Sequence, residues 1–202
     1  TLLRQHGQLD SLGYFATRRD KAVVWDTGSP QDARAGVSYR VVGSVALASG
    51  NPIGDPTRWT AAIEQFRSRV RENGWSMAVM GAGEAGAQSY AHVGLDAFEI
   101  GDEAILDMTA FSLEGRALKD VRQAVARIER RGYTVRVLRH SALAPADFQA
   151  LQDAAAAWRG DGGEERGFSM ALGRLGDPLD GQCVLVAAYD GEGAVRGFLS
   201  FV

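Results

Sequence analysis

The residues best suited to chemistry lie in one polar, glycine-rich loop, residues 158–170. Its centre holds two adjacent carboxylates, Glu164 and Glu165, which lie between Arg159 and Arg166. A carboxylate can accept charge-assisted hydrogen bonds from an ammonium group, and such bonds are about twice as strong as neutral ones. We therefore predict that this loop binds the amine of a substrate; the alternative is a mobile acidic loop without a ligand. The predicted binding residues are Glu164, Glu165, Arg166, Phe168, Ser169 and Met170.

A second candidate is a basic stripe on a long predicted helix, residues 112–131, which Ser112 can cap and Gly132 can end. At about 100° per residue, its basic and apolar residues fall on different sides. The stripe could bind the phosphates of tRNA or the anionic headgroups of a membrane. The alternative is a solvated face, partly neutralised by Asp120 and Glu129. The predicted phosphate-binding residues are Arg116, Lys119, Arg127, Arg130 and Arg131; the apolar residues are Leu118, Val121, Val125 and Ile128.

Two glycine-rich turns could bind a nucleotide or cofactor, but each has a simpler explanation. Residues 81–86 fit the GxGxxG pattern between a predicted strand and helix. That helix is short and no clear βαβ unit surrounds the pattern, so we favour a tight strand-to-helix turn. Residues 50–55 could place a phosphate at the start of the next helix. However, Pro52 and Pro56 remove two amide donors and Asp55 repels anions. Coenzyme A is therefore not favoured, and we predict no cofactor.

Composition restricts the remaining classes of protein. The net charge is -3, so a grip on nucleic acid would have to come from a local patch. One cysteine, Cys183, and three scattered histidines argue against a zinc site, and we predict no metal. No Ser-His-Asp or Cys-His set can be argued from spacing. No apolar run reaches the roughly 18–20 residues of a spanning helix, so we expect any membrane anchor to lie outside this segment.

The order of predicted elements indicates a mixed α/β fold. The chain stops within a strand, and a lone hairpin edge is a poor terminus, so we expect the second half to continue beyond Val202. The first half is predicted to contain a hairpin over 14–25, strands over 37–48 and 76–80, and helices over 59–71 and 85–92. Residues 97–108 are predicted to form one strand or a pair of strands broken at Gly101–Asp102. After the 112–131 helix, the second half is predicted to contain a strand over 133–138, a helix over 145–158 and a hairpin of 183–189 with 194–202.

Several strings in the chain resemble a known family. They are similar to the C-terminal catalytic region of phosphatidylglycerol lysyltransferases, also called multiple peptide resistance factors, and to related actinobacterial lysyltransferases. The resemblance implies two tandem GNAT-like acyltransferase units with mixed central sheets flanked by helices. Residues 1–111 would form the later part of the first unit, and residues 112–202 the linking basic helix and first part of a truncated second unit. The matching strings are residues 13–21, 48–55, 101–133 and 158–177.

The same resemblance implies an activity. It is the transfer of an amino acid, expected to be lysine, from aminoacyl-tRNA to phosphatidylglycerol at the cytoplasmic face of the cell membrane. This would change membrane lipid charge and bear on antibiotic resistance. Further donor-binding residues of the family would lie beyond Val202, so we assign no catalytic residue and expect this segment alone to be inactive. The alternatives are an acetyl-CoA-dependent N-acetyltransferase and a non-catalytic module that binds tRNA or an anionic membrane.

Overall fold

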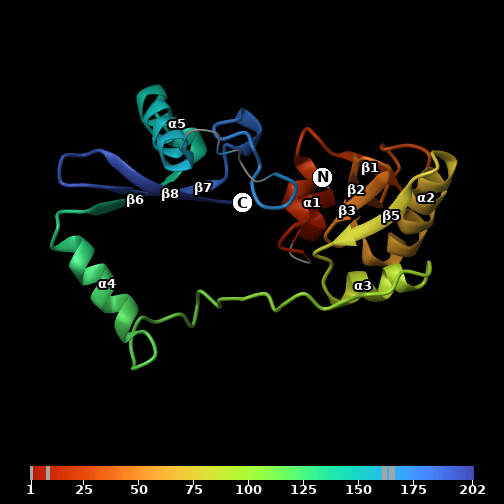
Figure 1. The fold of residues 1–202 in the computed structure, drawn as a ribbon, viewed down its shortest axis with the longest axis horizontal. Coiled ribbons are helices and arrows are strands. Elements are labelled where there is room, and N and C mark those ends of the chain that lie inside the picture. Colours follow the sequence, from red (N-terminus) through yellow and green to blue (C-terminus); the bar gives the residue numbers. More distant parts are fainter. Residues whose placement is uncertain (1, 8–9, 161–162, 164–166) are drawn as a thin grey trace. The chain divides into compact units, whose positions relative to one another are not determined.

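The chain folds into two compact units. The computed structural model describes residues 2–7, 10–160, 163 and 167–202. Unit 1 holds the described residues up to Glu99 together with a short later segment, residues 167–173, and unit 2 holds the other described residues (Figure 1). The return of 167–173 to unit 1 was not expected from the sequence. The assignment of 1–111 and 112–202 to successive GNAT-like units stays a prediction.

Unit 1 is built on a five-stranded sheet with the order β1-β2-β3-β5, in which β4 also pairs with β2. Its pairs are antiparallel except β3 with β5, which are parallel and are connected through helix α2. The strands are β1 (Ala22–Trp25), β2 (Ala35–Val42), β3 (Val45–Ser49), β4 (Ile53–Gly54) and β5 (Ser76–Met80). The α-helices are α1 (Leu2–His6), α2 (Trp59–Glu72) and α3 (Glu84–Ala91), with 3-10 helices at Gly13–Thr17 and Pro56–Arg58.

Helix α2 supplies the core of unit 1. Its apolar residues recur at helical spacing, so they form one stripe that packs on strands β1 and β2. Ile63 and Phe66 are fully buried there, and the Phe66 ring lies 5.0 Å from the ring of Tyr39. The helix ends at Asn73–Gly74, where Gly74 adopts the left-handed conformation that favours glycine. The sheet is thereby fixed against α2.

Unit 2 contains a three-stranded antiparallel sheet with the order β6-β7-β8. Helix α5 covers one face of it, where Leu151 packs with Leu185, Ala187 and Tyr189. Its strands are β6 (Thr134–Arg139), β7 (Val184–Tyr189) and β8 (Val195–Phe201). Its helices are α4 (Lys119–Glu129) and α5 (Pro145–Arg159), with 3-10 helices at His140–Ala142 and Pro178–Asp180. No helix in the described part of the chain is both long and apolar enough to cross a membrane.

Two predicted strands of the first half are wrong in detail. The hairpin over residues 14–25 is absent, because Gly13–Thr17 closes into a 3-10 helix and β1 pairs with β2 instead. The single strand over residues 37–48 is two strands joined by a turn, in which Gly43 adopts a positive φ of 59°. In both places the apolar pattern is real, but it does not specify which strand is the neighbour.

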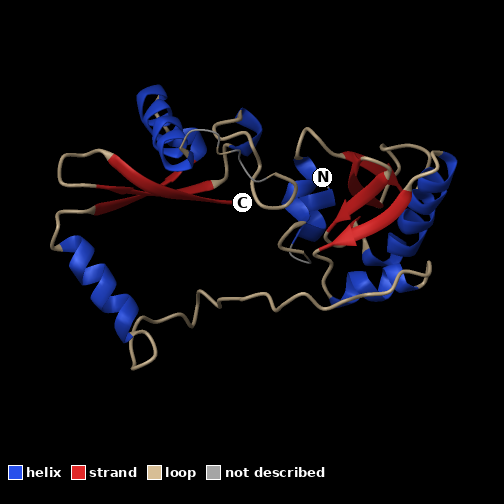
Figure 2. Cartoon of the chain, in the orientation of Figure 1, coloured by secondary structure: helices blue, strands red, loops and turns tan. Residues whose placement is uncertain are grey.

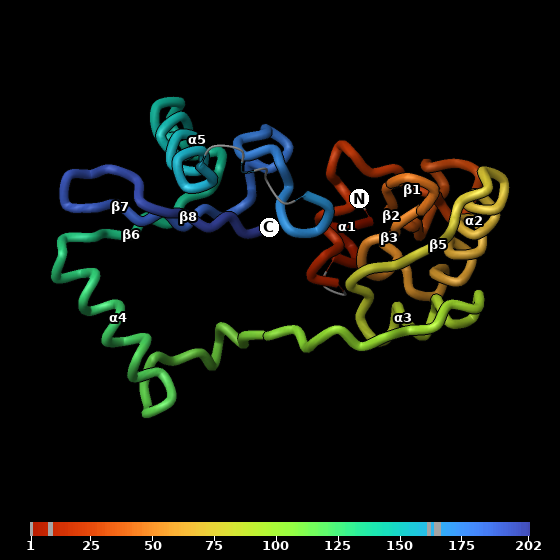
Figure 3. Tube along the Cα trace, in the orientation of Figure 1, coloured from red at the N-terminus to blue at the C-terminus, as the bar shows by residue number. Residues whose placement is uncertain are grey.

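The predicted strand over residues 97–108 does not form. Figure 2 draws this stretch as loop, and Figure 3 shows that its trace is extended. Phe98 and Ile100 are 86% and 81% exposed, and none of the described strands pairs with this stretch. A strand needs a hydrogen-bonding neighbour as well as an apolar alternation.

The predicted helix over residues 112–131 is shorter than expected, since α4 spans only Lys119–Glu129. Ser112 caps a local turn by accepting a bond from the amide of Glu114 at 3.1 Å, and Gly115 follows with a φ of 84°. These two features stop the helix from extending back to Ser112. The predicted elements at 59–71, 76–80, 85–92, 133–138 and 145–158 and the C-terminal hairpin are confirmed within two residues.

Candidate functional site

The segment 167–173 forms the candidate site, because it carries described residues of the predicted loop and is held against unit 1. The hydroxyl oxygens of Ser169 and Ser49 lie 2.7 Å apart, and Ser49 ends strand β3. The guanidinium of Arg18 donates to the carbonyl of Ala171. The amine nitrogen of Lys21 lies 4.4 Å from the centre of the Phe168 ring. Three separate contacts therefore fasten a segment that is more than a hundred residues away in sequence.

The structure places the predicted loop residues unevenly. Phe168 and Ser169 contact unit 1, whereas Met170 is 67% exposed. Glu164, Glu165 and Arg166 lie outside the described residues, so their predicted role in binding an amine stays a prediction.

Arg18 is held in position by a charge network. Its Nε and Nη2 atoms donate to the two carboxylate oxygens of Asp20 at 2.8 and 3.0 Å. Arg40, from strand β2, donates to the same carboxylate at 3.0 Å. The Arg18 hydrogen bond, opposed by burial, holds the pKa of Asp20 below its usual value. Since Asp20 fixes the guanidinium plane, Arg18 presents its remaining donor to Ala171.

Lys21 is the unusual residue of this site. Its amine nitrogen is buried and has no hydrogen-bond partner among the described residues. Burial is the main reason that the pKa of Lys21 falls to about 8, and the neighbouring charge of Arg18 lowers it further. Sequence reasoning missed this residue, because the string Arg18–Lys21 between two apolar runs looked like an exposed hairpin turn. The signals for Lys21 were its place next to a strand and its membership of the string 13–21 that resembles the family.

The backbone around Phe168 is specialised. Phe168 has a φ of 63°, the only positive value among described residues other than glycine. This left-handed conformation costs a bulky residue about 1–2 kcal/mol, so the contacts of the segment must outweigh that cost. At Gly167 a β-carbon would lie 3.0 Å from the Arg18 guanidinium, which explains the small residue there.

The turn at residues 50–55 has the place of a phosphate-binding loop, between β3 and α2, but its amides are already used. The amide of Gly50 donates to Met80, that of Asn51 donates to Asp10, and that of Asp55 donates to Arg34. Pro52 has no amide hydrogen, and neither has Pro56 directly after the turn. Four of the six positions, 50, 51, 52 and 55, therefore have no amide left to bind a pyrophosphate.

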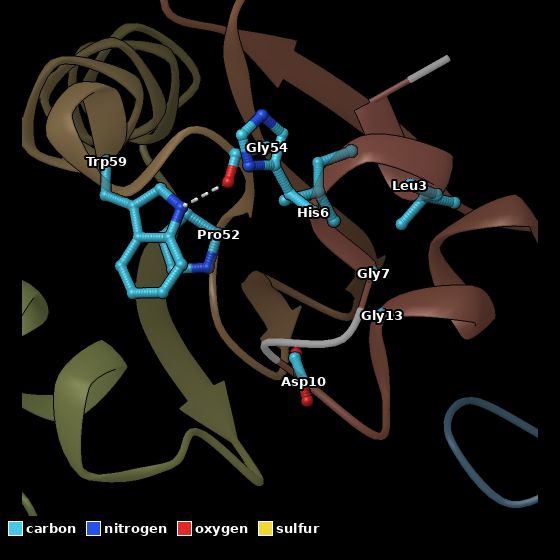
Figure 4. Close-up of a pocket in the computed structure, with 9 residues that line it drawn as sticks. Leu3, His6, Gly7, Asp10, Gly13, Pro52, Gly54 and Trp59 are labelled. Carbon is cyan, nitrogen blue, oxygen red and sulfur yellow. Dashed lines mark hydrogen bonds between the residues drawn. The ribbon is translucent and has the colours of Figure 1, made fainter.

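A small pocket lies between this turn and helix α1 (Figure 4). Its volume is about 10 Å³, room for roughly one water molecule. The indole nitrogen of Trp59 donates to the carbonyl of Gly54 across one wall. The pocket is too small to hold a cofactor. Its lining residues are Leu3, His6, Gly7, Asp10, Gly13, Pro52, Ile53, Gly54 and Trp59.

The GxGxxG pattern of residues 81–86 packs around one side chain. The side-chain oxygen of Asn51 accepts from the amide of Gly83 at 3.0 Å. A β-carbon on Gly86 would lie 2.0 Å from the same oxygen, so glycine is required for this close approach. A βαβ unit does exist here, β3-α2-β5, but it precedes the pattern. The glycines therefore serve the strand-to-helix turn that we favoured.

The predicted basic stripe is distributed differently from expectation. Arg116 precedes α4, and Arg130 and Arg131 follow its last residue. Arg127 and Arg130 share one exposed side of α4 and its C-terminal cap with Gln123 and Ala126. None of the described carboxylates forms an ion pair with the five predicted phosphate-binding residues.

Comparison with known proteins assigns the chain to a family. The family model described as "Phosphatidylglycerol lysyltransferase, C-terminal" matches residues 1–202. The chain belongs to this family. It is 52% identical over 201 residues to the lysylphosphatidylglycerol biosynthesis bifunctional protein LysX of Rhodococcus opacus (strain B4). It is 51% identical over 204 residues to LysX of Mycobacterium avium (strain 104). These matches cover 100% of the chain but only 18% and 17% of the two relatives.

A solved structure supports the fold. L-PGS from Bacillus licheniformis superposes with a TM-score of 0.83 at 21% sequence identity, over 98% of this chain and 58% of that one. The mixed α/β, GNAT-like fold expected from the sequence is confirmed, and so is the family resemblance.

Proposed function

We propose that the protein transfers lysine from lysyl-tRNA to a hydroxyl group of phosphatidylglycerol, at the cytoplasmic face of the cell membrane. The observation that carries this proposal is the unbroken match to the lysyltransferase family over residues 1–202. The names of the LysX relatives, which refer to lysylphosphatidylglycerol biosynthesis, point to the same product.

The proposed reaction is acyl transfer. The oxygen of the lipid hydroxyl attacks the carbonyl carbon of the lysyl ester, the hydroxyl proton is removed, and the ester bond to the tRNA ribose breaks. The ester is already activated, so positioning of the two substrates and removal of one proton are the tasks left to the protein. In this proposal the predicted loop, with Glu164 and Glu165, binds the lysyl ammonium.

The basic residues around α4 supply the proposed contact with phosphates. Arg127 and Arg130 share one exposed side of α4 and its C-terminal cap, and no described carboxylate forms an ion pair with either. Reversal of both charges, Arg127→Glu with Arg130→Glu, is expected to raise the KM for lysyl-tRNA and to flatten its dependence on salt by about one unit of slope per lost phosphate contact. Arg69→Glu is the matched control, because Arg69 is an exposed basic residue on helix α2.

Acetyl transfer from coenzyme A is less well supported, since the amides of the turn at residues 50–55 are engaged within the protein. One set of assays distinguishes lysyl transfer from acetyl transfer. The full-length protein is incubated either with radiolabelled lysyl-tRNA and phosphatidylglycerol vesicles or with labelled acetyl-CoA. Label in the lipid phase from lysyl-tRNA supports the proposal, and label from acetyl-CoA alone refutes it. The 202-residue chain alone is expected to be inactive.

A further inference from the structure

Lys21 is a buried base that the proposed binding roles leave unused. It lies directly before strand β1, and its amine nitrogen is buried without a hydrogen-bond partner in the described structure. A buried amine usually has a carboxylate or several acceptors around it, since an unpaired charge is costly in a site of low polarity. At Lys21 the carboxylates of Asp20 and Asp10 act on the charge of the amine without accepting a hydrogen bond from it, and the amine lies over the ring of Phe168.

The surroundings of Lys21 connect it to the candidate site. Its amine lies over the ring of Phe168, and the next residue, Ser169, has its hydroxyl 2.7 Å from that of Ser49. Phe168 and Ser169 are consecutive, so one short stretch of the segment contacts both the Lys21 amine and the Ser49 hydroxyl. An amine can accept the proton of a substrate hydroxyl, and protein hydroxyls can hydrogen-bond to its oxygen.

Burial is the main influence on the protonation of Lys21. Together with the smaller effect of the Arg18 charge, it lowers the pKa of Lys21 to about 8. Asp20 and Asp10 act in the opposite direction. Asp20 is engaged by Arg18 and Arg40, and Asp10 accepts bonds from the amides of Leu12 and Asn51.

We propose that Lys21 is the residue that accepts the proton of the acceptor hydroxyl during transfer. This inference rests on the proposed function. The neutral amine takes the proton while the hydroxyl oxygen bonds to the ester carbonyl carbon. When the ester bond to the ribose breaks, the resulting ammonium returns the proton to the ribose oxygen.

The test uses the full-length protein with lysyl-tRNA and phosphatidylglycerol vesicles. Lys21→Met keeps the length of the side chain but removes the base, and Lys21→Arg keeps the charge but cannot lose its proton at working pH. Both are expected to lower kcat by roughly 100-fold or more, the usual contribution of acid–base catalysis, with KM changed less than threefold. Arg19→Met, at the adjacent position, is the control and is expected to retain kcat.

Two readouts separate a catalytic role from a structural one. Small primary amines are expected to restore activity to Lys21→Ala, with rates that rise with the basicity of the amine. The wild-type kcat is expected to rise towards a plateau above pH 8, and this rise is expected to vanish in Lys21→Met. The α-amino group of the donor titrates in the same range, so the profile is judged as the difference between variant and wild type.

The outcomes are distinct. If the wild-type protein forms no lysyl lipid, the proposed function fails and this inference fails with it. If the wild type is active and Lys21→Met or Lys21→Arg retains kcat within threefold, only the role of Lys21 is refuted. Retention by Lys21→Arg alone would assign Lys21 as a cation that binds a phosphate group. Lost kcat in Lys21→Met and Lys21→Arg, together with amine rescue of Lys21→Ala, supports the inference.

Discussion

The two units bury their apolar residues to different degrees. In unit 1, the face of the sheet towards α2 is sealed, and Val37, Ile63 and Phe66 are fully buried. In unit 2, α5 seals one face of the sheet, but the opposite face is open, with Val135 and Val137 63% and 65% exposed. Leu199 and Phe201 of strand β8 share that open face and are 62% and 51% exposed.

The difference shows which apolar faces are covered by other residues of the same unit. Strands β6 and β7 carry apolar residues on both faces, a pattern typical of a sheet covered on both sides. The described residues cover only one of them. The apolar stripe of α4, including Val121, Val125 and Ile128, is also 40–45% exposed. Unit 1 should therefore behave as a stable body, and unit 2 should respond weakly to changes on its open face.

The largest expected effect is in the sealed core of unit 1. Phe66→Ala removes a fully buried ring that contacts Tyr39. We expect the free energy of unfolding of unit 1 to fall by about 3–5 kcal/mol, because both transfer energy and packing are lost. Denaturant titration with hydrogen exchange resolved by unit measures this loss. Unchanged protection in unit 1 would contradict the packing described.

A smaller effect is expected from the same kind of change in unit 2. Leu151→Ala empties the contact between α5 and the sheet, and Leu151 is fully buried. The expected loss is about 2–4 kcal/mol, confined to unit 2, since fewer buried side chains surround this site. Hydrogen exchange should show reduced protection in β6, β7 and β8. Protection in β2 and β3 should not change. Equal loss of protection in both units would show that they unfold together.

Asp26 should govern how the free energy of unfolding of unit 1 falls at low pH. Its carboxylate accepts from the amides of Arg34 and Ala35 at 3.0 and 3.2 Å and from Arg58 at 2.7 Å. Burial opposes ionisation, but these three donors outweigh it and hold the pKa of Asp26 below its usual value.

A lowered folded pKa means that the stabilisation is present above pH about 4 and is lost as the pH falls through the folded value. Asp26→Asn is expected to cost roughly 1–3 kcal/mol at pH 7 and to flatten the acid limb. Thermal unfolding of both proteins between pH 2.5 and 7, about the range of carboxylate titration, measures it. Parallel curves would exclude Asp26 as the cause.

The smallest effect is expected on the open face of unit 2. Val137→Thr changes a side chain that is 65% exposed, so stability should change by less than about 0.5 kcal/mol. Val37→Thr is the matched control, because Val37 is fully buried in unit 1 and should cost more. If Val137→Thr lowers stability as much as Val37→Thr, another surface must cover this face. The difference in burial between the two units would then be smaller than described.

Sequence patterns predicted the elements that depend on local signals. The apolar stripe and the Asn73–Gly74 pair after it predicted the bounds of α2 to within one residue. Pro145 marked the start of α5. Pairing between strands was less accessible. The run at residues 97–108 alternates like a strand, but no local signal reveals whether a neighbouring strand is present. Ser112 has a capping hydroxyl, yet it caps an isolated turn because Gly115 follows.

The candidate site was predictable only in part. The loop residues Phe168 and Ser169 stood out through their string and their resemblance to the family. The contact of that string with Lys21 and Ser49 joins positions more than a hundred residues apart. No periodicity encodes such a contact, and a lysine at the end of a charged run, Arg18–Lys21, looks like a surface residue. Tertiary folding alone buries the amine and lowers its pKa.

The most direct test of the central claim is the lipid composition of cells that express the full-length protein. Mass spectrometry of the extracted lipids should show phosphatidylglycerol that is heavier by one lysyl residue, and isotope-labelled lysine should enter that species. Cells that express Lys21→Met at equal protein level should lack it. Absence of lysyl phosphatidylglycerol from cells with abundant wild-type protein would contradict the account.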